Sequence, residues 1–125
     1  MALDRASGSR KIVEVAVPVP LYQCFDYDSG DLNPPAIGTR VQVPFGRRRL
    51  VGIVTGTHDH RDERSLRSLE SALDASPLFE PLDRELIEWT ARYFAAPIGE
   101  VYSLAIPARI RTRIASEYTS LLVAA

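Results

Sequence analysis

Cysteine is nearly absent from this chain of 125 residues, in which Cys24 is the single one. One cysteine excludes a disulfide within the chain and makes a cysteine-based zinc site implausible, which agrees with a reducing cytoplasm. The chain also has no apolar stretch long enough to cross a membrane, and its N-terminus lacks the apolar core of a signal peptide. We therefore expect a cytoplasmic domain with no bound metal and no membrane partner.

Motifs for nucleotide chemistry are absent as well. There is no GxxxxGK[ST] phosphate loop and no GxGxxG turn, and no motif fixes a nucleophile beside a base. The length suits one small domain and leaves no room for an additional enzyme-sized unit. We therefore expect no catalytic residues, no cofactor and no enzyme activity in this chain alone.

The formal net charge of −1 hides an uneven distribution. Seven arginines against three acids give residues 40–67 a net charge of +4, whereas two arginines against seven acids give residues 68–104 a net charge of −5. Nearly all the positive charge is arginine, since Lys11 is the only lysine. Arginine suits phosphate, but a GC-rich genome produces the same bias and is the favoured explanation of the overall composition. The cationic middle is the part that indicates a nucleic-acid contact.

Alternating apolar residues predict several short strands. The first is rich in valine, with Val13, Val15, Val17 and Val19 on one face, and two prolines near its end indicate an edge strand or one that ends early. Two of the later strands are expected to pair as a hairpin with its basic tip at Gly46–Arg49. The expected strands are Ile12–Val19, Gln23–Asp28, Thr39–Pro44 and Leu50–Thr57, and Leu66–Leu73 is expected to be another strand or a helix.

Residues 81–96 carry the clearest helical pattern, which Pro97 ends. Large apolar residues recur along it at helical spacing and are expected to be core rather than a ligand platform; they are Leu82, Leu86, Trp89 and Tyr93. Val101–Ile106 is expected to be a final short strand. These elements predict a mostly β fold with one main α-helix, a small twisted β-barrel or half-barrel (OB-like) closed by the helix.

Three segments in this order resemble one known family. They are residues 17–27 (VPVPLYQCFDY), 38–56 (GTRVQVPFGRRRLVGIVTG) and 93–107 (YFAAPIGEVYSLAIP). Together they are similar to the N-terminal 3′-end DNA-binding domain of primosomal protein N′, the replication-restart helicase PriA. The resemblance implies a DNA-binding domain over 11–108, preceded by residues 1–10, whose small and polar side chains predict a disordered tail. Residues 109–125 would be a linker or the start of a following winged-helix domain.

The resemblance also implies a site. Its pocket for the 3′ end of a DNA strand would be formed by Phe25, Asp26, Tyr27, Gly46 and Arg67, with Arg67 at the place where the family has a lysine. Arg47, Arg48 and Arg49 would hold the DNA backbone nearby. The family's ATP, magnesium and zinc belong to helicase and zinc-binding domains whose motifs this sequence lacks.

Each of these residues also has a structural interpretation. Phe25 and Tyr27 share one face of a strand, a pattern more typical of core. Asp26 could be an exposed strand residue or anchor a turn, and Gly46 could serve only the hairpin. A carboxylate repels phosphates, but a strand's 3′ terminus has a hydroxyl and no following phosphate, so Asp26 could accept a hydrogen bond there. Phe25 or Tyr27 could stack on the terminal base.

The resemblance therefore predicts a module that binds branched DNA at the 3′-hydroxyl end of a nascent strand, at stalled forks and D-loops, for replication restart. It would be part of a larger ATP-dependent DNA helicase that is cytoplasmic and nucleoid-associated. Other primosome proteins and single-strand-binding protein would be partners through that helicase. Two alternatives remain open: a protein–protein module of the primosome, with the basic hairpin facing an acidic partner, and an OB-like RNA-binding domain.

Overall fold

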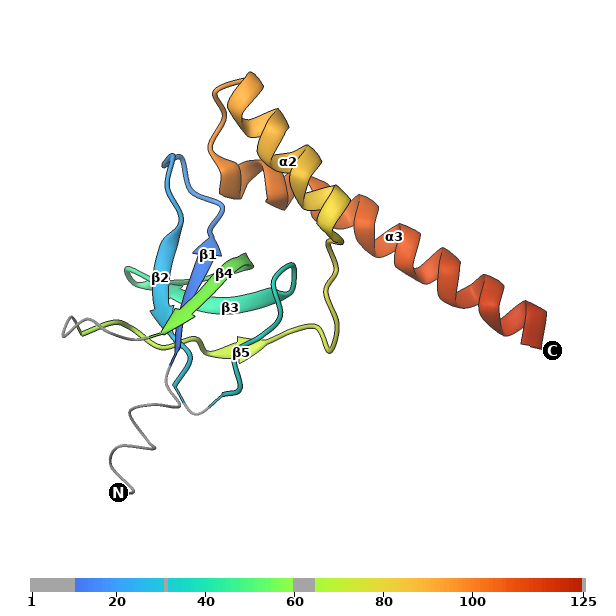
Figure 1. Ribbon diagram of the computed structural model, residues 1–125, viewed down its shortest axis with the longest axis horizontal. Helices are drawn as coiled ribbons and strands as arrows, with labels where there is room; N and C mark the ends of the chain where they lie inside the picture. Colours follow the sequence, from blue (N-terminus) through green and yellow to red (C-terminus); the bar gives the residue numbers. More distant parts are fainter. Residues whose placement is uncertain (1–10, 31, 60–64, 125) are drawn as a thin grey trace.

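A single antiparallel sheet forms one end of the molecule, and two helices form the other (Figure 1). The computed structural model describes residues 11–30, 32–59 and 65–124, so the expected tail of residues 1–10 lies outside the described residues. The strands are β1 (Lys11–Ala16), β2 (Phe25–Asp28), β3 (Arg40–Phe45), β4 (Arg48–Asp59) and β5 (Ser71–Ala72). Their order across the sheet is β2-β1-β4-β3-β5, and each neighbouring pair is antiparallel. The helices are α2 (Pro81–Tyr93) and α3 (Ile98–Ala124).

The strands follow the predicted pattern with adjusted bounds. β1 ends at Ala16, as expected for a strand that ends early, but it lies between β2 and β4 rather than at an edge. The hairpin between β3 and β4 is confirmed, with a shorter tip than predicted, because Phe45 already pairs with Arg48. Residues 66–73 form no helix and contribute β5, together with one isolated bridge from Ser68 to β2.

The edges of the sheet are partly tied together. The N–H of Asp28 donates to the carbonyl of Arg67 at 2.9 Å, and the N–H of Leu69 donates to the carbonyl of Asp28 at 2.9 Å. These bonds connect one end of β2 to the segment that precedes β5. No strand pairing joins β2 to β5 within the described ranges, so the predicted OB-like barrel is unconfirmed.

Two apolar clusters form the core. The first fills one face of the sheet and contains the four valines of the predicted alternation, together with Tyr27, Val41, Val43, Val54 and Leu69. The second lies between the sheet and the helices and consists of Ala16, Ile53, Leu78, Phe79, Ile87 and Tyr102. The sheet is therefore covered on both faces near the helices, which is why Ala16 and Ile53 are buried on the face opposite the valines.

α2 faces the core with its smaller side chains. Ile87 and Ala91 are its buried residues, whereas Trp89 and Tyr93 are 51% and 68% exposed. The prediction that the large apolar residues of this helix are core is therefore wrong. Both sides of the helix are apolar, and small side chains on the inner side allow α2 to approach α3 closely. The exposed row, called the α2 stripe below, comprises Leu82, Leu86, Trp89 and Tyr93.

The predicted strand Val101–Ile106 is also wrong, because these residues lie within α3. Apolar residues of α3 pack on the second cluster at helical spacing; they are Ile98, Val101, Tyr102, Ala105, Ile106 and Ile110. Pro107 lies inside the helix, where it removes one backbone hydrogen bond, and packing of this face offsets that loss. The fold thus has a second long helix, which runs past residue 108 without a break. The boundary of a following domain stays a prediction. Neither helix combines the length and apolar character that a membrane span requires.

The start of α3 lies directly against the chain that follows β1. A Cβ atom at Gly99 would stand 1.7 Å from the carbonyl oxygen of Val17 and 2.3 Å from its carbonyl carbon. Real Cβ atoms do not approach backbone so closely, so this contact requires glycine. The position of α3 over the residue 17–24 loop therefore depends on Gly99.

Asp74 holds the start of β3 to the loop before α2. Its buried carboxylate accepts from the backbone N–H of Arg40 at 2.9 Å and from the Arg40 guanidinium at 2.8 and 3.1 Å, and Arg113 lies 3.6 Å away. Burial alone would raise the pKa of Asp74, but the hydrogen bonds from Arg40 outweigh it and lower that pKa below its ordinary value of 3.8. The pair therefore stabilises the fold when Asp74 is ionised.

We expect Asp74→Ala to lower the free energy of unfolding at pH 7 by about 2 kcal/mol, because it removes hydrogen bonds to a charged acceptor. A lowered folded-state pKa gives stability that is fully present above the unfolded pKa of about 4 and is lost as the pH falls from there through the lower folded-state pKa. Urea denaturation at pH 7 and pH 3 tests this: the gap between wild type and variant should shrink at pH 3. A gap of the same size at both values would contradict the assignment.

Candidate nucleic-acid interface

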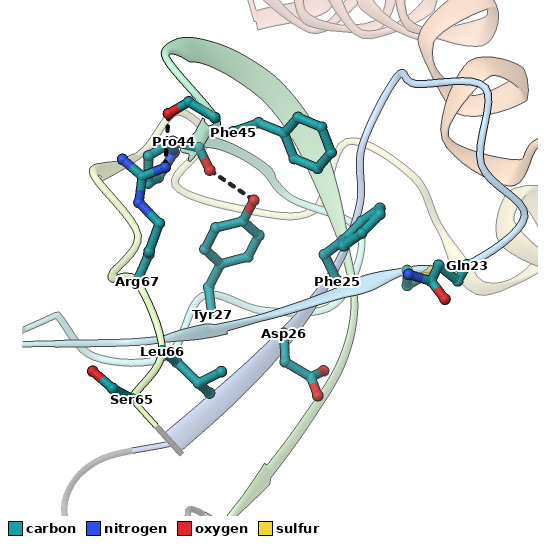
Figure 2. A pocket seen from close by; sticks show the side chains of 11 residues that line it. Gln23, Phe25, Asp26, Tyr27, Pro44, Phe45, Ser65, Leu66 and Arg67 are labelled. Atoms are coloured by element: carbon teal, nitrogen blue, oxygen red, sulfur yellow. Dashed lines mark hydrogen bonds between the residues drawn. The ribbon is translucent and has the colours of Figure 1, made fainter.

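The residues expected to hold a strand end line one pocket of about 500 Å³ (Figure 2). The pocket is bounded by β2, the hairpin turn and residues 65–67. Its lining comprises Gln23, Cys24, Phe25, Asp26, Tyr27, Pro44, Phe45, Gly46, Ser65, Leu66 and Arg67. All five predicted pocket residues are in this set, although they come from three separate parts of the chain. We call this space the β2 pocket.

Tyr27 forms the floor of the β2 pocket rather than a platform within it. Its side chain is 4% exposed and belongs to the first core cluster. Its hydroxyl donates to the carbonyl of Pro44 at 2.8 Å, and burial raises the pKa of the phenol. Tyr27 is therefore a core residue, as the alternative structural interpretation predicted. Its side chain connects β2 to β3 and does not offer a free face for stacking.

Phe25 is the aromatic residue that remains at the β2 pocket. It is half-buried and meets Phe45 edge to face, with ring centroids 5.1 Å apart and an interplanar angle of 79°. Figure 2 shows both rings on the same side of β2 as Tyr27. This pair packs against the first cluster, so Phe25 can take part in stacking without losing its support.

Asp26 points to the opposite side of β2 from Phe25 and Tyr27 (Figure 2). Across the β1–β2 pair it stands directly opposite Glu14. The N–H and C=O groups of Asp28 point away from β1 and bond to Arg67 and Leu69. Because hydrogen-bonded and non-hydrogen-bonded pairs alternate along an antiparallel ladder, Asp26 and Glu14 form a non-hydrogen-bonded pair, in which the two residues lie closer together. Two carboxylates therefore share one face here, and the Glu14 carboxylate accepts from the Thr55 hydroxyl at 2.8 Å.

Gly46 and Arg67 close the β2 pocket on the hairpin side. Gly46 has a φ of +60°, as expected at the first position of a two-residue hairpin turn, and a Cβ there would meet no atom within 4 Å. The Arg67 guanidinium donates to the carbonyl of Gly46 at 2.9 Å. Arg67 therefore ties the turn to residues 65–67 while its side chain stays exposed.

The three hairpin arginines lie beside the β2 pocket and do not line it. Arg47, Arg48 and Arg49 are all exposed. The Nε atom of Arg49 is 3.2 Å from Glu70, an exposed ion pair of small energetic weight. The hairpin thus presents cations next to the pocket mouth, which suits contacts to a strand's phosphates.

Several pocket residues were not found from the sequence. They are Gln23, Cys24, Pro44, Phe45, Ser65 and Leu66. Phe45 carried a detectable signal, since it is the aromatic residue of the quoted PFG segment, but nothing marked Gln23 or Ser65. Within the described part of the chain, no three histidine, cysteine or acidic side chains are grouped as metal ligands would be.

Comparison with known proteins shows the family of this chain. Residues 14–107 match the family model of the PriA 3′ DNA-binding domain. The chain belongs to this family. Replication restart protein PriA of Haemophilus influenzae is 40% identical over 103 residues, covering 81% of this chain and 14% of that protein. PriA of Buchnera aphidicola from Acyrthosiphon pisum is 28% identical over 98 residues, covering 77% and 14%. PriA of Treponema pallidum is 24% identical over 116 residues, covering 86% and 18%.

The match to the 3′ DNA-binding domain family covers β1 from Glu14, the whole β2 pocket and the packed first part of α3. The chain spans about a seventh of the length of these PriA relatives from Haemophilus influenzae and Buchnera aphidicola. Membership of the family therefore concerns a DNA-binding domain of replication restart proteins and does not extend to the rest of those proteins.

Proposed function

We propose that this domain binds the 3′-hydroxyl end of a nascent DNA strand, at stalled forks and D-loops, and so helps to restart replication. The observation that carries the proposal is the β2 pocket, where five residues from three chain segments surround one space in a member of a DNA-binding family. In this proposal the domain works within a larger ATP-dependent helicase. ATP hydrolysis would belong to other domains of that helicase, because this sequence has no phosphate loop.

The charges of the β2 pocket support an end rather than an internal stretch of DNA. An internal nucleotide brings a phosphate on each side, and the carboxylate of Asp26, which is among the pocket residues, repels it. A 3′ terminus brings a hydroxyl, which can donate to a carboxylate. The exposed arginines of the hairpin, Arg47 and Arg48, are placed to bind phosphates outside the pocket. Asp26 at the pocket and the arginines on the hairpin thus favour a strand end without excluding DNA.

Binding to three labelled substrates tests this function: a fork with a 3′-hydroxyl, the same fork with a 3′-phosphate, and single-stranded RNA. We expect the hydroxyl fork to bind tightest, by about tenfold or more over the phosphate fork, and its affinity to fall with rising salt. Equal affinity for the two forks would refute end recognition. Tighter binding of RNA would instead favour the RNA-binding alternative, which depended on a closed barrel that is unconfirmed.

A second candidate function, protein binding, is supported by the α2 stripe. Trp89 and Tyr93 stack on each other, with centroids 4.9 Å apart, and stay largely exposed. Contiguous exposed aromatic residues are typical of protein interfaces. This surface, rather than the basic hairpin, is the better candidate for a contact with primosome proteins or single-strand-binding protein.

We expect the double variant Trp89→Ala/Tyr93→Ala to keep its affinity for the hydroxyl fork, because neither residue lines the β2 pocket. Its affinity for purified single-strand-binding protein should fall about tenfold or more, as aromatic residues dominate interface energies. Fluorescence anisotropy measures both. A variant that retains the protein contact would show that the α2 stripe is not that interface.

A further inference from the structure

A second pocket, of about 420 Å³, opens next to the β2 pocket. It lies between the residue 17–24 loop, α2 and the connection from α2 to α3, and is lined by Tyr22, Cys24, Glu88, Ala91, Arg92, Ala95, Ala96 and Ile98. Cys24 lines both pockets, so they are neighbours separated by one residue. We call this space the Tyr22 pocket.

The lining of the Tyr22 pocket suits a flat, mostly apolar group. Ala91, Ala95 and Ala96 bring little side-chain bulk, and Tyr22, 73% exposed, offers an aromatic face at the mouth. Burial raises the pKa of the Cys24 thiol, so this wall is neutral at physiological pH. Glu88 can accept and Arg92 can donate hydrogen bonds at the polar edge of such a group.

A nucleobase has these properties: two apolar faces and an edge of donors and acceptors. A strand whose last nucleotide occupies the β2 pocket must place the preceding nucleotide on an adjoining surface. The hairpin tip offers phosphate contacts through Arg47 and Arg48 but no ring. The Tyr22 pocket offers a ring, and proteins commonly hold the bases of single strands by stacking them on aromatic side chains.

We propose that the Tyr22 pocket is the subsite for the base that precedes the 3′-terminal nucleotide, with Tyr22 as its stacking partner. This rests on the proposed function, since it takes the strand end to lie in the β2 pocket. The domain then holds two nucleotides, one on each side of Cys24. The β2 pocket then binds the terminal nucleotide, and the Tyr22 pocket binds the preceding base through separate contacts.

The test uses short single-stranded DNA with a 3′-hydroxyl, either intact or with an abasic site at the penultimate position. We expect the abasic strand to bind wild type about tenfold more weakly, or about 1.4 kcal/mol. Tyr22→Ala should bind both strands with the weaker affinity, and Tyr22→Phe should behave like wild type, because the ring and not the hydroxyl is needed. Ala96→Leu, which fills the pocket, should lose the preference as Tyr22→Ala does. Tyr118→Ala, at an exposed tyrosine on α3, is the matched control and should change nothing.

Wild type that binds intact and abasic strands equally would overturn the proposal, and the pocket would then serve another partner, such as a protein. Tyr22→Ala that weakens both strands by the same factor would also overturn it. Failure of end recognition is distinguishable, because it appears as equal binding of 3′-hydroxyl and 3′-phosphate strands, which is measured separately from the intact and abasic pair.

Discussion

Asp26→Ala is expected to lose discrimination between a 3′-hydroxyl and a 3′-phosphate fork while keeping most of its general affinity for DNA. Loss of a hydrogen bond to a charged acceptor should weaken binding to the hydroxyl fork by about 1.5–3 kcal/mol, roughly tenfold to a hundredfold. Binding to the phosphate fork should weaken much less, because removal of the carboxylate also removes a repulsion. The ratio of the two dissociation constants, measured by fluorescence anisotropy, is the readout.

Two controls make this result specific to Asp26. Glu14→Gln removes the neighbouring charge but can still accept from Thr55, so it should reduce discrimination only in part. Arg48→Ala should weaken binding to both forks alike and lower the salt dependence, as expected for a phosphate contact. Circular dichroism on each variant checks folding. A folded Asp26→Ala domain that still separates the forks as wild type does would show that another group senses the strand end.

Gly99→Ala is expected to be the most destabilising single-methyl addition in the described part of the chain. The new Cβ would overlap the backbone of Val17, which cannot rotate away as a side chain could, so α3 would have to lift from the end of β1. We expect the free energy of unfolding to fall by about 3 kcal/mol. Chemical denaturation followed by circular dichroism measures this.

Gly56→Ala is the matched control for that substitution. A Cβ at Gly56 would lie 3.7 Å from the nearest atom of Glu14, which is an ordinary contact. This variant should stay within about 0.5 kcal/mol of wild type. If Gly99→Ala unfolds at the same denaturant concentration as Gly56→Ala, the close approach of α3 to Val17 is not required.

The sheet was largely predictable because its signals are local. Alternating valines and the PFG turn mark β1, β3 and β4 directly in the sequence, and the hairpin follows from their spacing. Closure of the sheet was not predictable, since it depends on which backbone hydrogen bonds residues 66–73 make to β2 and which they make to β3. The sequence left that segment undecided between strand and helix; in the structure its first part bonds to β2 and its last part to β3.

The helices show why apolar spacing alone is ambiguous. α2 has an apolar row on each side, and the choice between Leu86 and Ile87 as the buried one depends on what α2 packs against. In α3, prolines at positions 97 and 107 and an apolar run between them suggested a strand. Tertiary packing of Tyr102 and its neighbours overrides that local signal.

The candidate site was predicted through the family resemblance and not through its chemistry. Composition gave the cationic hairpin, but only the resemblance singled out Asp26 and Arg67, which are 41 positions apart and meet at one pocket. Their part in binding DNA stays a prediction. The sequence left a stacking role open to Tyr27, but its side chain is buried. Which face of the sheet a strand residue occupies depends on the register of pairing, which for Tyr27 is set opposite Val13 of β1.

The length of α3 has a mechanical consequence. At about 1.5 Å per residue, its 27 residues extend roughly 40 Å, and Figure 1 shows the far half leaving the body of the domain. The near half packs against Val17 and Phe79, so the angle of the helix is set beside the β2 pocket and the Tyr22 pocket. A tilt of a few degrees at Gly99 would sweep the far tip through several ångströms. Pro107, which leaves one carbonyl without its partner, is where the helix bends most easily.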